Sequence, residues 1–117
     1  MTAVPGRAGS EAPAPIFAAL GDPTRLRLVA RLCEGGPQSI TRLAAGSYFT
    51  RQAITKHLRV LEAAGLVRGF RHGRERRWEI RARRLDLARR HLDRISRQWT
   101  QRLEALKRHV EDMPDEP

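Results

Sequence analysis

The apolar residues of this chain change their spacing twice, and this change limits its possible folds more than any other feature. Up to Gly65 they recur every three or four residues, as on the buried face of a helix. Trp78 and Ile80 then alternate with polar residues, as in a strand. From Leu85 to Val110 the helical spacing returns for about seven turns. The pattern predicts short helices, one β-hairpin and one long final helix.

The N-terminal part is predicted to contain a mobile arm, a short apolar segment and a first full helix. Residues 1–13 are rich in Gly, Ala, Pro and Ser, which favours a mobile arm. The segment Ile16–Leu20 is apolar, and Asp22-Pro23 begins a helix as a cap residue followed by proline. Gly35-Gly36-Pro37 ends that helix. Its expected buried residues are Leu26, Val29, Ala30 and Leu32.

Two further helices joined by a tight turn are predicted next. Ser39 caps a short helix that closes at Gly46, and Thr50 caps a longer one that ends at Gly65. The longer helix has an apolar face, made of Ile54, Leu58 and Leu61, and an opposite polar face, made of Gln52, Thr55, Lys56 and Arg59. This arrangement predicts a helix-turn-helix whose second helix enters the major groove of DNA, with Thr50 and Arg51 near phosphate.

Two side chains in this region have more than one interpretation. His57 lies between the polar face and the core side, so it either contacts DNA or packs within the domain. Cys33 is the single cysteine, which excludes a disulfide within the chain and fits a reducing cytoplasm. Its apolar neighbours favour a buried, inert thiol over a redox switch.

A basic hairpin directly follows the second helix of this pair. Residues 66–71 and 74–80 are predicted strands, and His72-Gly73 is the predicted two-residue turn. The expected tip carries Arg71, His72, Arg74, Arg76 and Arg77. Such a hairpin is a wing, and Arg74 and Arg76 are expected to contact the DNA backbone or minor groove. Charge that only increases solubility is the alternative.

The long final helix carries an apolar stripe that one small domain is too short to cover. Its members are Leu85, Ala88, Leu92, Ile95, Trp99, Leu103, Leu106 and Val110. A homodimer would bury the stripe, and the alternative is that the helix folds back onto its own domain. The predicted interface residues are Ile16, Phe17, Leu20, Leu92, Ile95, Trp99 and Leu103.

Charge and composition limit the function classes. The chain has 23 Lys+Arg against 13 Asp+Glu among 117 residues, a net charge of +10, which indicates a polyanionic partner. An anionic membrane surface is the competing partner. Without a long apolar run the chain is expected to be soluble and cytoplasmic. It has no Gly-rich phosphate loop, identifiable carboxylate pair or nucleophile–base set, so neither an enzyme nor a cofactor is expected.

Three motifs together resemble the ArsR/SmtB family of bacterial winged-helix repressors. The matching segments are Ala19–Arg25, Ser39–Ala44 and Thr50–Val67, followed by the arginine-rich hairpin. The likeness covers roughly residues 16–80, and the last helix is similar to the family's dimerisation helix. The resemblance implies a homodimer, recognition helices in successive major grooves, and repression of a nearby promoter.

The chain departs from the family's metal-sensing members. Those members carry Cys-x-Cys in the helix before the turn, where this chain has Ser39–Leu43, or Asp-x-His and His-x-x-Glu/His in the last helix. The nearest approaches here are His91-Leu92-Asp93 and His109-Val110-Glu111, in the wrong order. The two histidines are about 27 Å apart along one helix, so only an antiparallel dimer could bring them together. No metal site is expected, and the inducer stays unknown.

The predicted fold is mainly α with a β-hairpin wing: a dimeric winged helix-turn-helix with a long C-terminal helix. The predicted divisions are an arm at 1–14, a DNA-binding domain at 15–82, a dimerisation helix at 83–112 and a tail at 113–117. The protein is predicted to be a sequence-specific transcriptional regulator, and more specifically a repressor that binds a palindromic operator. A non-specific architectural DNA-binding protein and a winged helix used only for protein contacts are the alternatives.

Overall fold

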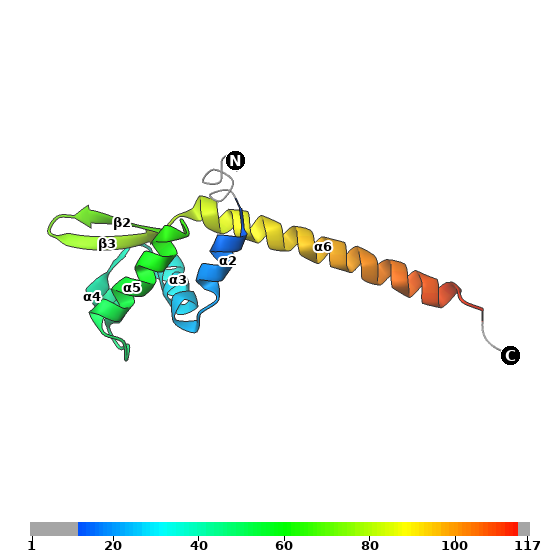
Figure 1. The fold of residues 1–117 in the computed structure, drawn as a ribbon, viewed down its shortest axis with the longest axis horizontal. Helices are drawn as coiled ribbons and strands as arrows, with labels where there is room; N and C mark the ends of the chain where they lie inside the picture. Colours follow the sequence, from blue (N-terminus) through cyan, green and yellow to red (C-terminus); the bar gives the residue numbers. More distant parts are fainter. Residues whose placement is uncertain (1–11, 115–117) are drawn as a thin grey trace, which may run out of the picture.

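The computed structural model describes residues 12–114 and shows a winged helix-turn-helix with a long last helix (Figure 1). The helices are α2 (Ala14–Leu20), α3 (Pro23–Gly35), α4 (Ile40–Ala44), α5 (Arg51–Ala63) and α6 (Ala82–Asp112). The strands are β1 (Gln38–Ser39), β2 (Val67–His72) and β3 (Glu75–Ile80). Most of the predicted arm, residues 1–11, and residues 115–117 of the predicted tail lie outside the described residues.

The helices begin at the predicted cap residues. The Asp22 carboxylate accepts hydrogen bonds from the backbone amides of Thr24 at 2.9 Å and Arg25 at 3.0 Å. Ser39 caps α4 in the same way, and Thr50 caps α5 by accepting from the Ala53 amide at 3.1 Å. These side chains satisfy amides that have no partner inside the helix, so the local sequence determines where each helix starts.

The turn between the two strands of the wing lies one residue later in the chain than the sequence predicted. His72 pairs with Glu75, so the two-residue turn is Gly73-Arg74 and the predicted His72-Gly73 turn is wrong. Gly73 has a φ of +66°, which suits the first position of the turn. In this register Gly69 lies opposite Trp78, whose ring is buried in the core. The strand β1, which was not predicted, pairs with β3 at the sheet edge.

The core lies between α3, α5 and the sheet, and α3 faces it differently from the prediction. Its buried residues are Leu28, Val29 and Leu32. The predicted burial of Leu26 and Ala30 is wrong, since both are exposed, and so is the predicted burial of Cys33. These three residues follow one another by four and three positions, so they share one side of α3, which the domain leaves exposed.

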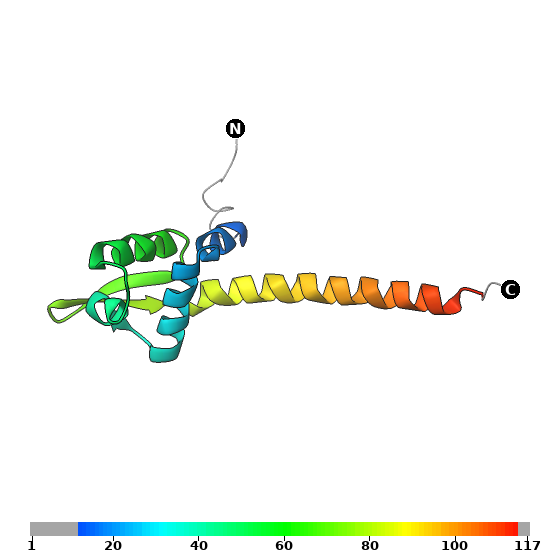
Figure 2. The ribbon, with the colours of Figure 1, turned by 90° about the horizontal axis from the view of Figure 1, so that it is seen from below.

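Helix α6 leaves the domain and extends alone (Figures 1 and 2). Near its start, Leu85 and Ala88 pack against the core. From Leu92 to Val110 the apolar stripe is exposed, at 47–64% of each side chain's full surface. The alternative in which α6 folds back onto its own domain is therefore wrong. Within the described residues, no helix is long and apolar enough to cross a membrane.

Candidate nucleic-acid interface

The buried face of α5 anchors the helix to the core and so fixes the position of its exposed face. Ile54, Leu58 and Leu61 are at most 1% exposed and fix the helix on the core. The polar face consists of Arg51, Gln52, Thr55, Lys56 and Arg59, which are exposed apart from a half-buried Thr55. The Thr55 hydroxyl donates to the Arg51 carbonyl at 2.8 Å, so its proton is engaged and its oxygen is left to act as an acceptor. The face offers donors and acceptors at fixed positions, as base recognition requires.

Arg31 positions α4 relative to α3. Its guanidinium donates to the carbonyl oxygens of Leu43 at 2.6 Å and Arg42 at 2.9 Å, at the C-terminal end of α4. The Arg42 carbonyl also accepts from the backbone amide of Ala45 at 3.3 Å, and a cation is favourable at this end of the helix dipole. The sequence alone does not reveal this role of Arg31, because a long-range contact between a side chain and a backbone carbonyl leaves no periodic signal.

His57 is held in a network within the domain. Its Nδ1 lies 3.3 Å from Nη1 of Arg25 and 3.9 Å from the Asp22 carboxylate, and the Phe49 ring meets it edge-on at 6.2 Å between centroids. Nε of Arg25 donates to the Ala19 carbonyl oxygen at 2.6 Å. The network connects α5 to the end of α2.

The carboxylate in this network stays ionised. The hydrogen bond from the Arg25 amide lowers the pKa of Asp22 below its usual value, and the nearby Arg25 guanidinium and His57 ring add to the effect. An ionised Asp22 caps α3 and attracts Arg25 at the same time. The sequence predicted the cap, but not the contact with His57.

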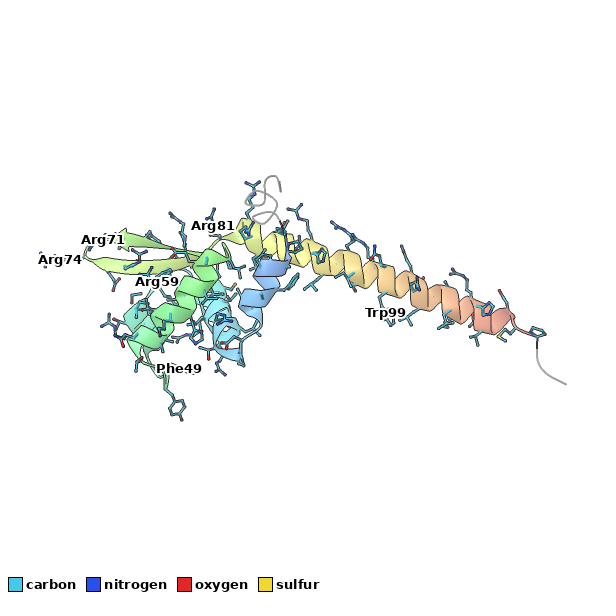
Figure 3. The ribbon with its side chains drawn as sticks, in the orientation of Figure 1. Phe49, Arg59, Arg71, Arg74, Arg81 and Trp99 are labelled. Carbon is cyan, nitrogen blue, oxygen red and sulfur yellow. The ribbon has the colours of Figure 1, made fainter. Side chains whose placement is uncertain are left out.

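Some arginines of the wing have a carboxylate or aromatic partner among the described residues, and others have none. Arg77 binds Glu75 at 2.9 Å, and Arg68 binds Glu79 at 3.1 Å. The Arg76 guanidinium stacks over the Trp78 ring, 5.1 Å from its centroid. Arg71 and Arg74 stand exposed at the far end of the hairpin, with no carboxylate partner within residues 12–114 (Figure 3). His72 is exposed beside them.

The described residues do not fit the metal sites of the metal-sensing relatives. No three His, Cys, Asp or Glu side chains in that part of the chain are close enough to share an ion. His91 packs against the Phe17 ring at 6.0 Å between centroids, while His109 lies in the distal part of α6.

Comparisons with known proteins agree with this geometry. Residues 20–69 match the family described as a helix-turn-helix domain. An uncharacterized HTH-type transcriptional regulator of Methanocaldococcus jannaschii is 35% identical over 63 residues, which are 54% of this chain and 71% of that protein. The HTH-type regulator YuzN of Bacillus subtilis is 43% identical over 67 residues, 52% of this chain and 73% of that protein.

A solved structure extends the likeness into the last helix. The ArsR-like transcriptional regulator of Rhodococcus sp. RHA1 is 39% identical to this chain, with a TM-score of 0.72. The match covers 94% of this chain and 100% of the solved one. A likeness that spans the whole solved chain includes both the winged domain and much of α6.

Proposed function

The chain belongs to the ArsR family of winged helix-turn-helix transcriptional regulators, and from this premise we propose that it represses a nearby promoter by binding a palindromic operator as a homodimer. The family and the fold make it a transcriptional regulator and not an enzyme. The observation that carries the proposal is the rigid polar face of α5 beside a wing with unpaired arginines at its end. Such a surface combines groups that recognise bases with groups that bind phosphate.

The side chains of the interface have different proposed roles. Gln52 and Arg59 recognise base edges, since glutamine pairs with adenine and arginine with guanine. Thr50 and Arg51 bind phosphate at the start of α5. The other proposed DNA contacts are Thr55, Lys56, Arg71, His72, Arg74 and Arg76. We assign His57 to positioning α5, because its Nδ1 is engaged with Arg25 and Asp22.

The proposed homodimer follows from the exposed stripe of α6. A continuous row of half-exposed apolar residues from Leu92 to Val110 is a surface that soluble monomers avoid. Phe17 and Leu20 of α2 are partly buried against the core, and the Phe17 ring lies 6.0 Å from the His91 ring of α6, so we propose that α2 adds to the interface. Ile16 was also predicted at the interface, but it is 0% exposed and has no surface to offer a partner. We propose residues 15–82 as the DNA-binding domain and 83–112 as the dimerisation helix.

Footprinting on the DNA upstream of the protein's own gene tests this function. A homodimer should protect two half-sites related by a dyad, with centres about one helical turn, roughly 34 Å, apart. Transcription in vitro from that promoter should fall when the protein is added. Protection without a dyad, or with no effect on transcription, would contradict the proposal.

The wing is predicted to supply affinity more than sequence choice. Changing Arg74 and Arg76 to alanine together should flatten the slope of log affinity against log salt by about 0.9 for each phosphate group that the variant no longer binds. The operator and random DNA should be affected alike, because the phosphate backbone carries no sequence information directly. Arg77→Ala is the matched control, since Arg77 is paired with Glu75. An unchanged slope in the double variant would show that neither Arg74 nor Arg76 binds phosphate.

Zinc and arsenite are predicted to leave operator binding unchanged at micromolar concentration. The segment Ser39–Leu43 stands where metal-sensing relatives carry Cys-x-Cys, and the α6 histidines are far apart. The measurement is operator binding by fluorescence anisotropy during a metal titration. Release of DNA that persists in Cys33→Ser would revive a histidine site between protomers.

A further inference from the structure

A cavity of about 440 Å³ lies between α3 and the helix-turn-helix. One wall is a single face of α3, where Thr24, Arg27 and Arg31 follow one another by three and four residues. The opposite wall is the turn between α4 and α5, at residues 45–49. We call this space the turn cavity. Its volume is typical of a site for a small molecule.

The floor of the turn cavity is apolar and belongs to the core. Leu28 of α3, Leu43 of α4 and Ile54 of α5 line it, and each is at most 3% exposed. On the turn, Phe49 is 41% exposed and Tyr48 is fully exposed, and both also line the cavity. Exposed aromatic side chains next to an apolar floor are a surface that favours an apolar ligand group.

The charge of the turn cavity is positive and not compensated. The residues that line it include Arg27 and Arg31 but no Asp or Glu. Arg31 donates to the carbonyl oxygens of Leu43 and Arg42, which are uncharged, so its charge is not neutralised. Arg27 is exposed, and the ion pairs in the described part of the chain are formed by other cations. Two cations one turn apart on a helix repel each other, so an anion between them is favoured.

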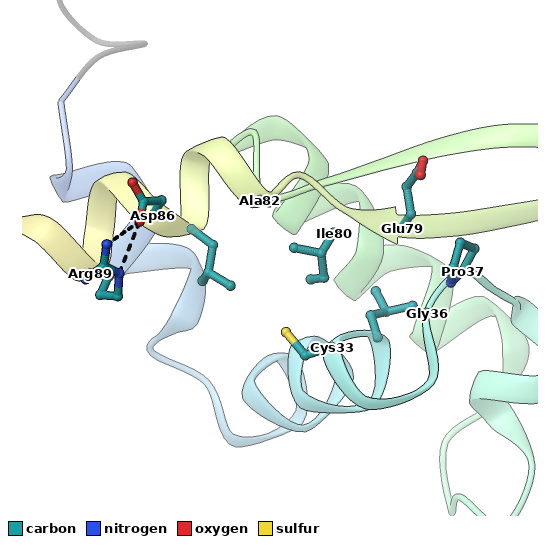
Figure 4. A pocket seen from close by; sticks show the side chains of 10 residues that line it. Cys33, Gly36, Pro37, Glu79, Ile80, Ala82, Asp86 and Arg89 are labelled. Carbon is teal, nitrogen blue, oxygen red and sulfur yellow. Dashed lines mark hydrogen bonds and ion pairs between the residues drawn. The ribbon is translucent and has the colours of Figure 1, made fainter.

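A second cavity, at the start of α6, differs in this respect (Figure 4). It has a volume of about 480 Å³, and Glu79, Asp86 and Arg89 are among the residues that line it. Arg89 binds Asp86 at 2.6 Å and Asp93 at 3.1 Å, so its charge is already balanced. The two cavities are similar in volume, but of the two the turn cavity is the one that attracts an anion.

We propose that the turn cavity binds a small organic carboxylate with an apolar, ring-sized body, and that this ligand is the signal to which the regulator responds. A carboxylate fits the planar fork of the Arg27 guanidinium. Thr24, one turn earlier on the same face, carries a hydroxyl that can donate to the same group. The apolar body fits between the floor and Phe49. An inorganic anion would leave this apolar surface unused.

The turn cavity touches every helix of the DNA-binding surface, so a ligand there can affect DNA binding. Phe49 lines the cavity and meets the His57 ring of α5 edge-on at 6.2 Å between centroids. The turn leads directly into Thr50, the cap of α5, and into Arg51. A carboxylate beside this turn repels the DNA phosphate proposed to bind at the start of α5, so the ligand weakens DNA binding. This regulatory role rests on the function proposed above, whereas binding of the ligand does not.

Ligand binding is tested without DNA, with 1-naphthoate as the probe and the neutral 1-naphthamide as its control. The acid should shift the amide NMR signals of residues 24–31 and 45–49 in a saturable way, and the amide should bind about ten-fold more weakly. Arg27→Gln should weaken binding of the acid about ten-fold and leave binding of the amide unchanged. Arg89→Gln is the matched control, because it makes the same change at the second cavity, and it should leave both affinities unchanged.

Three results would overturn the site. The first is that the acid and the amide bind equally well, or that neither shows saturable binding. The second is that the shifted signals are confined to residues 79–89, which would place the probe in the second cavity. The third is that Arg27→Gln lowers the affinity for random DNA and flattens its salt dependence. Arg27 would then be a contact to the DNA backbone.

Operator binding tests the regulatory role separately. Saturating 1-naphthoate should weaken operator binding by the wild type about ten-fold, and DNA should weaken binding of the probe by the same factor, because coupling between two sites is reciprocal. Arg27→Gln should bind the operator like the wild type but should not respond to the probe. Probe binding without any change in operator affinity would overturn the regulatory role and keep the site. Probe binding by a protein that does not distinguish its operator from random DNA would contradict the proposed function and keep the site.

Discussion

Trp99→Glu is expected to convert the protein to a monomer and to abolish tight operator binding. Trp99 lies in the middle of the exposed stripe and is 64% exposed in the protomer. A carboxylate there would have to be desolvated in the paired state, and the cost of burying an unpaired charge exceeds what the neighbouring contacts supply. Two linked half-site contacts bind about 10²–10⁴ more tightly than one, and this factor should disappear. Sedimentation and operator binding measure the two effects.

Gln101→Glu is the matched control for this variant. Residue 101 is exposed on the side of α6 away from the stripe, and the substitution changes the charge by the same amount. It should stay dimeric and keep operator affinity. Random-DNA binding should partly survive in Trp99→Glu, since the winged domain is intact. A variant that stays dimeric, or a loss of thermal stability without a change of mass, would contradict the proposed interface.

Gln52→Ala or Arg59→Ala is expected to weaken operator binding while leaving random-DNA binding much less affected. A good bidentate contact with a base contributes about 1–3 kcal/mol of discrimination, so the operator affinity should fall about 5- to 150-fold. Both side chains are exposed on the polar face of α5, so folding should not change. Circular dichroism and thermal unfolding check the fold, and competition between the two DNA fragments measures the effect.

Val60→Ala is the control on the same helix. Val60 is 43% exposed one helical turn beyond Lys56, and its side chain has no group that could pair with a base. Its replacement should leave both affinities unchanged. If Gln52→Ala and Arg59→Ala lowered both affinities equally, these residues would contribute only to non-specific binding.

Local signals predicted the parts of the site that local chemistry determines. Asp22, Ser39 and Thr50 cap their helices because each side chain reaches an amide within the same turn. The face of α5 followed from the spacing of Ile54, Leu58 and Leu61, which are all buried. The exposed stripe of α6 was also predicted, because its length exceeds what one small domain covers.

The errors concern features that depend on packing between distant segments. The apolar residues of α3 could face the core for two different rotations of the helix about its own axis. Contacts with α5 and β3 select the rotation that buries Leu28 and exposes Cys33. The wing turn shifted because burial of Trp78 opposite Gly69 determines the strand register. The contact of Arg25 with His57 joins residues 32 positions apart, which no local pattern encodes.

Specific recognition of an operator by this protein is tested best by the ratio of two affinities. The wild-type protein is titrated, at one moderate salt concentration, against its own upstream DNA and against random DNA of equal length. A specific regulator binds its site about 10³–10⁷ more tightly than random DNA. We expect a ratio in that range. A ratio near one would contradict it, and would show that the net charge of +10 acts alone in a non-specific architectural protein.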